Sequence, residues 1–186
     1  IYNICGIEKV LSEGDITAVK IHFGEKGNHA YINPTYVRQV INKINEQNVY
    51  PFITDTNTLY SGERNNSIKH IKTAVENGFA HSVVNAPIII ADGINGKNYV
   101  EEKIGLKHFE TVKIAGEIYN SNSMVVLSHF KGHELAGFGG ALKNLAMGCA
   151  PQIGKKEQHS TLKPLTKPSR CTGCKQCEKI CNHNAI

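Results

Sequence analysis

The sequence predicts an α/β protein with a mostly parallel or mixed sheet covered by helices, followed by a small cysteine-rich module at the C-terminal end. Short apolar runs alternate with segments of helical periodicity, which is typical of strand–helix–strand units. Polar clusters follow several of these runs, and parallel strands gather ligand-binding residues at their carboxyl ends. The 186 residues, 40% of them hydrophobic, suffice for one substantial domain plus a small appended module.

The first half of the chain is expected to form two strand–helix pairs. A buried strand is predicted over residues 15–23, where apolar residues dominate. Pro34 then opens a helix that carries apolar residues at helical spacing. The next predicted strand is Tyr50–Asp55, and a polar loop follows it. A second helix is expected over residues 66–76 and stops at the Asn-Gly pair that ends with Gly78.

The second half continues the alternation. Strands are predicted over residues 87–91, 109–115 and 124–129, and Asn-Gly and Asp-Gly pairs indicate turns within 92–96. A third helix is expected over residues 140–147, after a glycine-rich stretch. Strands that alternate with helices in this way predict a largely parallel sheet with both faces covered.

Composition divides the chain into three parts. We expect an α/β domain with a ligand cleft over residues 1–150, a basic linker over 151–169 and, over 170–186, a partial module whose four closely spaced cysteines resemble a ferredoxin run. The formal net charge is +5, and residues 155–179 hold seven Lys/Arg against two Glu, which accounts for the whole excess. This positive charge either guides an acidic redox partner or belongs to a solvated linker, and the sequence leaves both readings open.

Several classes of protein are disfavoured. No apolar run is long enough to cross a membrane, and the basic stretch lacks the interleaved aromatic residues of a nucleic-acid surface. Six cysteines without a secretory signal indicate a reducing environment. We therefore expect a cytoplasmic protein that binds neither membrane nor nucleic acid.

The last sixteen residues carry the clearest chemical signal. Four cysteines follow the C-x2-C-x2-C-x3-C spacing of bacterial ferredoxins, in which thiolates hold a 4Fe–4S cluster and the fourth cysteine serves a second cluster. Structural zinc prefers two C-x2-C pairs set well apart, so a zinc site that includes His183 is a weaker alternative. A disulfide framework is weaker still. The predicted iron ligands are Cys171, Cys174, Cys177 and Cys181.

The cysteine run supplies three ligands for one cluster and one for another. We therefore expect the native polypeptide to continue beyond Ile186 into a second cysteine run, so that the full-length protein holds two clusters. Cys149 or Cys5 could supply a fourth ligand from within the chain, although isolated cysteines are more often small buried hydrophobic residues. Asn182 stands where the ferredoxin pattern has proline.

The main domain contains three polar clusters that follow predicted strands and could form one cleft. The richest combines histidines and lysines with four glycines in nine residues, which allow a close approach to an anion. A glycine turn beneath a tightly docked helix, and Asx turns after strands, remain structural alternatives. The candidate ligand-binding residues are His22, His29, Asp55, His129, Lys131, Gly137, Gly139, Gly140, Lys143 and Asn144.

These motifs resemble the DUF362 family of iron–sulfur proteins. The resemblance is carried by HFGEKGNH at 22–29, DTNTLY at 55–60, ADG at 91–93 and KGHELAGFGGALKNLAMGC at 131–149, and it covers essentially the whole chain. It implies an α/β domain joined to a ferredoxin-like module with cluster-binding cysteines. The family has no settled activity, so the resemblance implies the cofactor much more than a reaction.

The glycine-rich stretch is also similar to a segment of the nickel-dependent lactate racemases. That similarity implies an acid–base role for His133, cofactor attachment for Lys143 and nickel ligation for His159. The turn here has an extra residue before the lysine, and a proline normally found near Gly148 is absent. A shared fold is therefore better supported than shared chemistry.

Three functional hypotheses follow. The first is a redox protein in which a 4Fe–4S module exchanges electrons with an unidentified partner while the cleft binds a small anionic ligand or second cofactor. The second is a metal- or nucleotide-dependent enzyme related to the lactate racemases, with His133, Lys143 and His159 as catalytic residues. The third is a binding module in which the cluster only stabilises a small domain.

Overall fold

The computed structural model describes residues 2–133, 137–160 and 167–181. Its centre is a four-stranded sheet in the order β3-β2-β1-β6, in which every neighbouring pair is parallel. The strands are β1 (Ile16–Lys20), β2 (Tyr50–Asp55), β3 (Ile88–Ile90) and β6 (Ser123–Val126). The predicted α/β class is confirmed, with a central sheet that is wholly parallel within the described residues.

Helices connect the strands as the periodicity predicted. Helix α1 (Pro34–Asn45) begins where the Asn33 side chain accepts a hydrogen bond from the Thr35 backbone N–H, and it buries three apolar side chains. Helix α2 (Ser67–Glu76) is capped by Asn66 and followed by Gly78, whose φ of +89° ends the helix. A short helix, α3 (His81–Val84), leads to β3.

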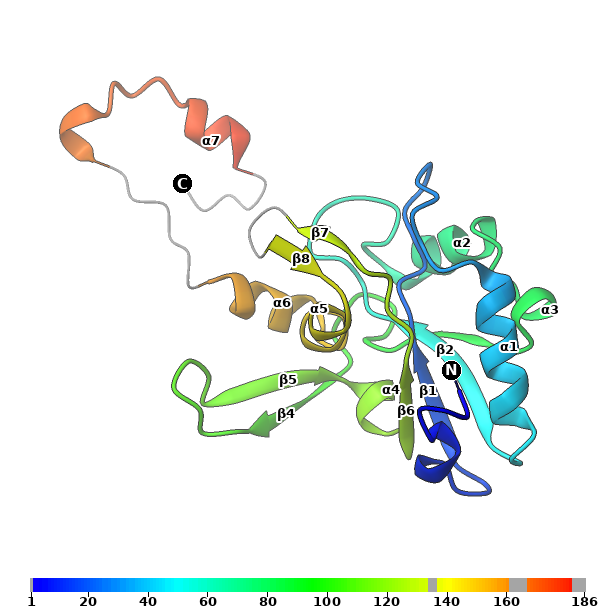
Figure 1. The fold of residues 1–186 in the computed structure, drawn as a ribbon. Helices are drawn as coiled ribbons and strands as arrows, with labels where there is room; N and C mark the ends of the chain where they lie inside the picture. The colour runs from blue at the N-terminus through cyan, green and yellow to red at the C-terminus, as the bar shows by residue number, and fades with distance from the viewer. Residues whose placement is uncertain (1, 134–136, 161–166, 182–186) are drawn as a thin grey trace.

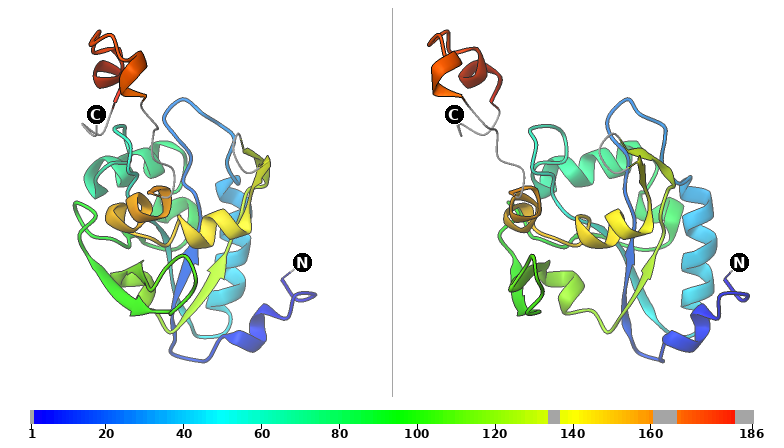
Figure 2. Two further views of the ribbon diagram at one scale, coloured as in Figure 1. Left: turned by 90° about the vertical axis from the view of Figure 1, so that its left-hand side faces the viewer. Right: turned by 60° about the vertical axis from the view of Figure 1, so that its left-hand side comes forward.

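The hydrophobic core lies between the sheet and these helices. Alternate residues of β1 and its extension pack against the apolar face of α1, and Phe23 meets Phe79 edge to face with ring centroids 5.3 Å apart. Helices α1 and α3 lie on one side of the sheet, and α5 lies on the other (Figures 1 and 2). The core holds the carboxyl ends of β1 and β2 in fixed register, Lys20 opposite Thr54.

A hairpin outside the main sheet differs from the expected alternation. Strand β5 (Thr111–Ala115) falls within a predicted strand, but it pairs antiparallel with β4 (Tyr99–Lys103), which was not predicted. The short helix α4 (Gly116–Tyr119) follows and leads to β6. The hairpin lies beside the central sheet rather than in it (Figure 1).

After β6 the chain builds a second small hairpin, β7 (Lys131–His133) with β8 (Gly137–Gly139), followed by α5 (Ala141–Ala146). Residues expected to begin a linker instead form helix α6 (Gln152–His159), whose Gly154 and Lys155 are buried. The first half of that segment therefore packs as part of the α/β domain.

The remaining described elements are short. A 3-10 turn, η1 (Ile7–Val10), precedes β1, and η2 (Pro168–Arg170) and α7 (Gln176–Ile180) carry the cysteine run. In the described parts of the chain, no helix combines the length and apolar character needed to cross a bilayer.

Candidate anion-binding site

A pocket of about 270 Å³ lies at the carboxyl ends of β1, β2 and β6. This is the place where an open parallel sheet binds ligands. The pocket walls come from segments far apart in sequence: the loops after the three strands, the β7–β8 hairpin, α5 and α6. The lining residues used below are His22, Asp55, Tyr60, Arg64, His129, Lys131, Gly139, Gly140, Lys143, Asn144, Gly148, Lys155 and His159.

The floor of the pocket is a buried ion network centred on Asp55. The Lys20 Nζ lies 2.9 Å from Asp55 Oδ1, and Arg64 Nη1 lies 3.1 Å from Asp55 Oδ2; all three side chains are at most 5% exposed. Burial alone would raise the pKa of Asp55, but the nearby positive groups, Lys20 foremost, outweigh it and hold the pKa well below its usual range. Asp55 is therefore a carboxylate whose two oxygens are already engaged.

The Arg64 guanidinium has several partners besides Asp55. Its Nη2 donates hydrogen bonds to the Glu25 carboxylate and, at 2.9 Å, to the Tyr60 hydroxyl, and it lies 3.2 Å from His22 Nε2. The His22 Nδ1 accepts a hydrogen bond from the Gly24 backbone N–H at 2.9 Å. Burial, reinforced by the charge of Arg64, lowers the pKa of His22 to about 4, so this imidazole is neutral at physiological pH.

Asn144 ties α5 to the sheet. Its Oδ1 accepts a hydrogen bond from Lys20 Nζ at 2.6 Å, and its Nδ2 donates to the Leu127 backbone oxygen at 3.1 Å. Gly148 closes the same turn, since a Cβ there would overlap the Asn144 backbone oxygen and lie 2.8 Å from Lys20 Nζ. The Asn144 side chain therefore positions α5 against the sheet. Close packing against Asn144 and Lys20 explains why residue 148 is a glycine.

Lys155 joins the pocket from α6. Its Nζ donates hydrogen bonds to Thr56 Oγ1, to the Asn57 backbone oxygen at 2.9 Å and to the Ala150 backbone oxygen at 2.7 Å. Burial lowers the pKa of Lys155 to about 8. The ammonium group therefore clamps the loop after β2 onto the segment that leads into α6.

The β7–β8 hairpin and α5 form the more open wall. Lys131 and His133 come from β7, and Lys143 comes from α5; Lys143 Nζ and His133 Nε2 are hydrogen-bond partners. Burial and, next, the charge of Lys131 lower the pKa of Lys143. Two lysines on one wall repel each other, and a bound anion would relieve that repulsion.

The balance of charge decides what the pocket can hold. Among the described lining residues, four are Lys or Arg, and Asp55 is the one carboxylate. Because Asp55 is already paired with Lys20 and Arg64, it offers little to repel an anion. The geometry thus fits a small anionic ligand with more than one negative charge or acceptor group.

The structure brings together most of the predicted ligand-binding residues. His22, Asp55, His129, Lys131, Gly139, Gly140, Lys143, Asn144 and His159 all line the pocket. Among the predicted residues outside this lining, His29 is exposed in the loop after β1, while Gly137 pairs with His133 in the hairpin. His133 reaches the site through its contact with Lys143.

Sequence reasoning missed three buried cations: Lys20, Arg64 and Lys155. Lys20 had a usable signal, because a charged residue inside an otherwise apolar strand needs a buried partner. Arg64 stands in a polar loop and Lys155 in a basic stretch, where nothing distinguishes them from solvated neighbours. Their roles depend on contacts between segments remote in sequence.

The predicted iron ligands lie on the short segment around α7. Three of the thiols are exposed and Cys181 is partly buried. Gly173 and Lys175 have φ of +69° and +57°, so the backbone turns tightly on both sides of Cys174. Within the described residues, no three His, Cys, Asp or Glu side chains are grouped as a metal site.

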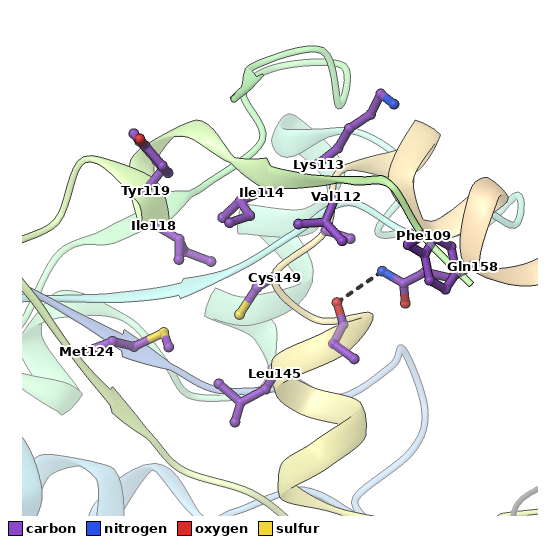
Figure 3. A pocket seen from close by; sticks show the side chains of 12 residues that line it. Phe109, Val112, Lys113, Ile114, Ile118, Tyr119, Met124, Leu145, Cys149 and Gln158 are labelled. Atoms are coloured by element: carbon purple, nitrogen blue, oxygen red, sulfur yellow. Dashed lines mark hydrogen bonds between the residues drawn. The ribbon is translucent and has the colours of Figure 1, made fainter. Parts of the chain in front are cut away.

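A second cavity, about 680 Å³, lies between the β4–β5 hairpin, α4, α5 and α6. Figure 3 shows that its lining is mostly apolar, with Met124, Leu145 and Cys149 facing the space. Burial raises the pKa of the Cys149 thiol. Cys149 is therefore a buried small side chain in the α/β domain.

Taken together, the fold and the site define an α/β protein with a cationic pocket at the carboxyl ends of its parallel strands. The family model described as a domain of unknown function, DUF362, matches residues 17–184, and the chain belongs to this family. No curated protein and no solved structure matches the chain.

Proposed function

We propose that this protein is an iron–sulfur redox protein whose α/β domain binds a small anionic ligand. The observation that carries the proposal is the convergence of four cationic side chains on a pocket whose single described carboxylate is already neutralised. The cysteine run at the end of the same chain supplies the redox element of the proposal.

Some pocket residues shape the site and others can contact a ligand, which supports specific binding rather than nonspecific electrostatic attraction. Asp55, Asn144 and Lys155 are saturated by protein groups, so they set the shape of the site. Lys131 and Lys143 form no ion pair within the described residues, and the hydrogen-bond partner of Lys143 Nζ is the His133 imidazole rather than a carboxylate. An anion would therefore be held mainly by these two lysines, above the Arg64 guanidinium.

The residues around α7 fit a 4Fe–4S cluster by their chemistry and spacing. Hydrogen bonds from the Gln176 backbone N–H and the Thr172 side chain lower the pKa of Cys174, which favours the thiolate that iron requires. The tight turn at Gly173 lets nearby cysteines approach one another. Cys171, Cys174 and Cys177 would hold one cluster, and Cys181 would be a ligand of another. When bound, such a cluster supplies one-electron transfer.

Location and partner follow from the same chemistry. Reduced thiols and exposed cluster ligands fit a reducing cytoplasm. Residues 155–179 provide the excess positive charge that would guide an acidic electron-transfer partner. We therefore propose a cytoplasmic location and a redox protein as the partner.

The cluster is tested by anaerobic reconstitution of the full-length protein with iron and sulfide. We expect visible iron–sulfur absorbance with matching iron and sulfide content, and its loss in Cys174→Ser. Ser169→Ala is the control, because Ser169 is exposed beside the run and supplies no thiolate. Iron-free protein, or equal iron in both variants, would contradict the cluster. A redox titration then separates electron transfer from a purely structural cluster.

The anion pocket is tested separately by calorimetric titration with inorganic phosphate. We expect saturable binding that weakens as ionic strength rises, since attraction between charges is screened by salt. Absence of binding at low ionic strength would remove the anion-binding half of the proposal and leave the cluster untouched.

A metal-dependent enzyme remains the second candidate, favoured by one observation. Lys143 and His159 line the same pocket, and Lys143 contacts His133, as the similarity to the lactate racemases required. Nickel titration of the wild type and of His159→Ala tests this candidate. Equal nickel binding by the two proteins would exclude His159 as a ligand.

A further inference from the structure

The β7–β8 hairpin presents two basic side chains on one face. Side chains alternate along a strand, so Lys131 and His133 point to the same face of β7, and Gly132 points to the other. Their cross-strand partners are glycines: Lys131 pairs with Gly139 and His133 with Gly137. A face built from two basic residues and two glycines leaves open space where opposing side chains would otherwise stand.

Lys143 enters that space from α5. A Cβ added at Gly139 would lie 3.9 Å from Lys131 Cγ and 3.9 Å from Lys143 Cδ, so both lysine side chains pass close to this glycine. The Lys143 Nζ is hydrogen-bonded to His133 Nε2 and forms no ion pair within the described residues. Among the described residues, the groups next to Lys143 Nζ are a neighbouring cation and an imidazole rather than a carboxylate.

This arrangement suits Lys143 to act as a nucleophilic amine as well as to attract an anion. A nearby cation disfavours the ammonium form, and the pKa of Lys143 is lowered by burial and by Lys131. A carboxylate partner would have the opposite effect. The pocket also supplies Arg64 and Lys131 to hold a negative group of a substrate close to Lys143.

We propose that Lys143 forms an imine with a small aldehyde or ketone that carries a carboxylate or phosphate group. This inference rests on the proposed anion-binding pocket and names the class of ligand that it takes. A pocket of about 270 Å³ is at the small end for ligand sites, which favours a compact carbonyl compound.

The proton and oxygen balance closes within the site. His133 Nε2 accepts a proton from the Lys143 ammonium, and the freed Nζ lone pair attacks the carbonyl carbon. A proton moves from nitrogen to the former carbonyl oxygen, which gives a neutral carbinolamine. The imidazolium of His133 then protonates the hydroxyl group, the C–O bond breaks and water leaves. The products are a protonated imine on Lys143, one water molecule and neutral His133.

Reductive trapping tests the proposal on the full-length protein. The probes are pyruvate, which carries a carboxylate, and glycolaldehyde phosphate, each with cyanoborohydride, and peptide mass spectrometry locates the adducts. We expect at least one probe to modify Lys143 severalfold faster than Lys72, an exposed lysine of α2 that faces a carboxylate. Which probe reacts decides between a carboxylate and a phosphate.

Two variants sharpen the result. Lys143→Arg keeps the positive charge and should abolish the fast adduct, while His133→Gln should slow its formation at least severalfold with Lys143 still present. Phosphate titration of the same samples reports the anion pocket independently. If Lys143 reacts no faster than Lys72 with either probe while phosphate still binds, the imine proposal is overturned and the anion pocket stands. If phosphate fails to bind, the anion pocket itself is lost.

Discussion

Replacing Asp55 by Asn tests whether the buried ion network holds the pocket together. The substitution keeps the side-chain shape but removes the charge shared by Lys20 and Arg64, whose side chains are 1% and 4% exposed. Removing one partner of a buried ion pair typically costs about 3–5 kcal/mol, because the remaining charge is left buried without compensation. For a chain of this size, that loss corresponds to a fall in Tm of roughly 6–20 °C.

Urea unfolding followed by circular dichroism measures the effect, since the chain has no tryptophan to report by fluorescence. Glu76→Gln is the matched control: it makes the same chemical change in the exposed pair with Lys72, where the N–O distance is 3.7 Å. We expect that control to stay within about 0.5 kcal/mol of the wild type. A loss below about 1 kcal/mol in Asp55→Asn would refute the reasoning.

Two further measurements separate charge from shape. Adding Lys20→Met to Asp55→Asn should recover part of the lost stability, because it removes a buried ammonium group that has no counter-charge; a strictly additive loss would contradict this. The lowered pKa of Asp55 also determines how its contribution to the free energy of unfolding depends on pH. Its contribution is present above the ordinary carboxyl pKa of 3.8 and is lost as pH falls below it. Asp55→Asn should lack that acid-dependent loss.

Three other predictions concern the pocket and its supports. Lys131→Met should weaken phosphate binding about tenfold in calorimetry, whereas Lys107→Met, on the distant β4–β5 hairpin, should leave it unchanged. Burial lowers the pKa of His70 from 6.5 to about 3. Below pH 6.5 His70 is therefore protonated in the unfolded chain while it stays neutral in the folded chain. The free energy of unfolding should therefore fall by about 2 kcal/mol from this residue between pH 6.5 and 5, and the pH profile of His70→Phe should be flatter. Gly148→Ala should destabilise by about 1–3 kcal/mol in urea unfolding, because the new methyl group meets the Asn144 backbone oxygen; unchanged stability would show that the turn relaxes freely.

Periodicity and end signals predicted the central fold well. The strand at Tyr50–Asp55 was predicted with its observed bounds, and α1 begins at the predicted Pro34. Strand β4 was not predicted from the sequence, because Glu101 and Glu102 interrupt the apolar alternation that would indicate a strand. Helix α6 was not predicted either, because its polar, basic sequence resembles a solvated linker. Its packing against the domain depends on the buried Lys155.

The candidate site was predictable only as far as local sequence carries information. The position of Lys131 and Lys143 near His22 follows from the rule that loops after parallel strands converge. The partners of Arg64 could not be found in this way, because Glu25 and Asp55 approach it only in three dimensions. Local motifs therefore located the pocket, while the charges that organise its floor needed the fold.

Helix α5 is a partition between two compartments of opposite character. Asn144 and Met147 line the cationic pocket, while Leu145 and Ala146 line the apolar cavity of Figure 3. Any shift of this short helix that widens one space narrows the other. A ligand that filled the apolar cavity would therefore change the volume left for an anion in the cationic pocket. The hydrogen bond between Asn144 and Lys20 opposes such a shift of α5.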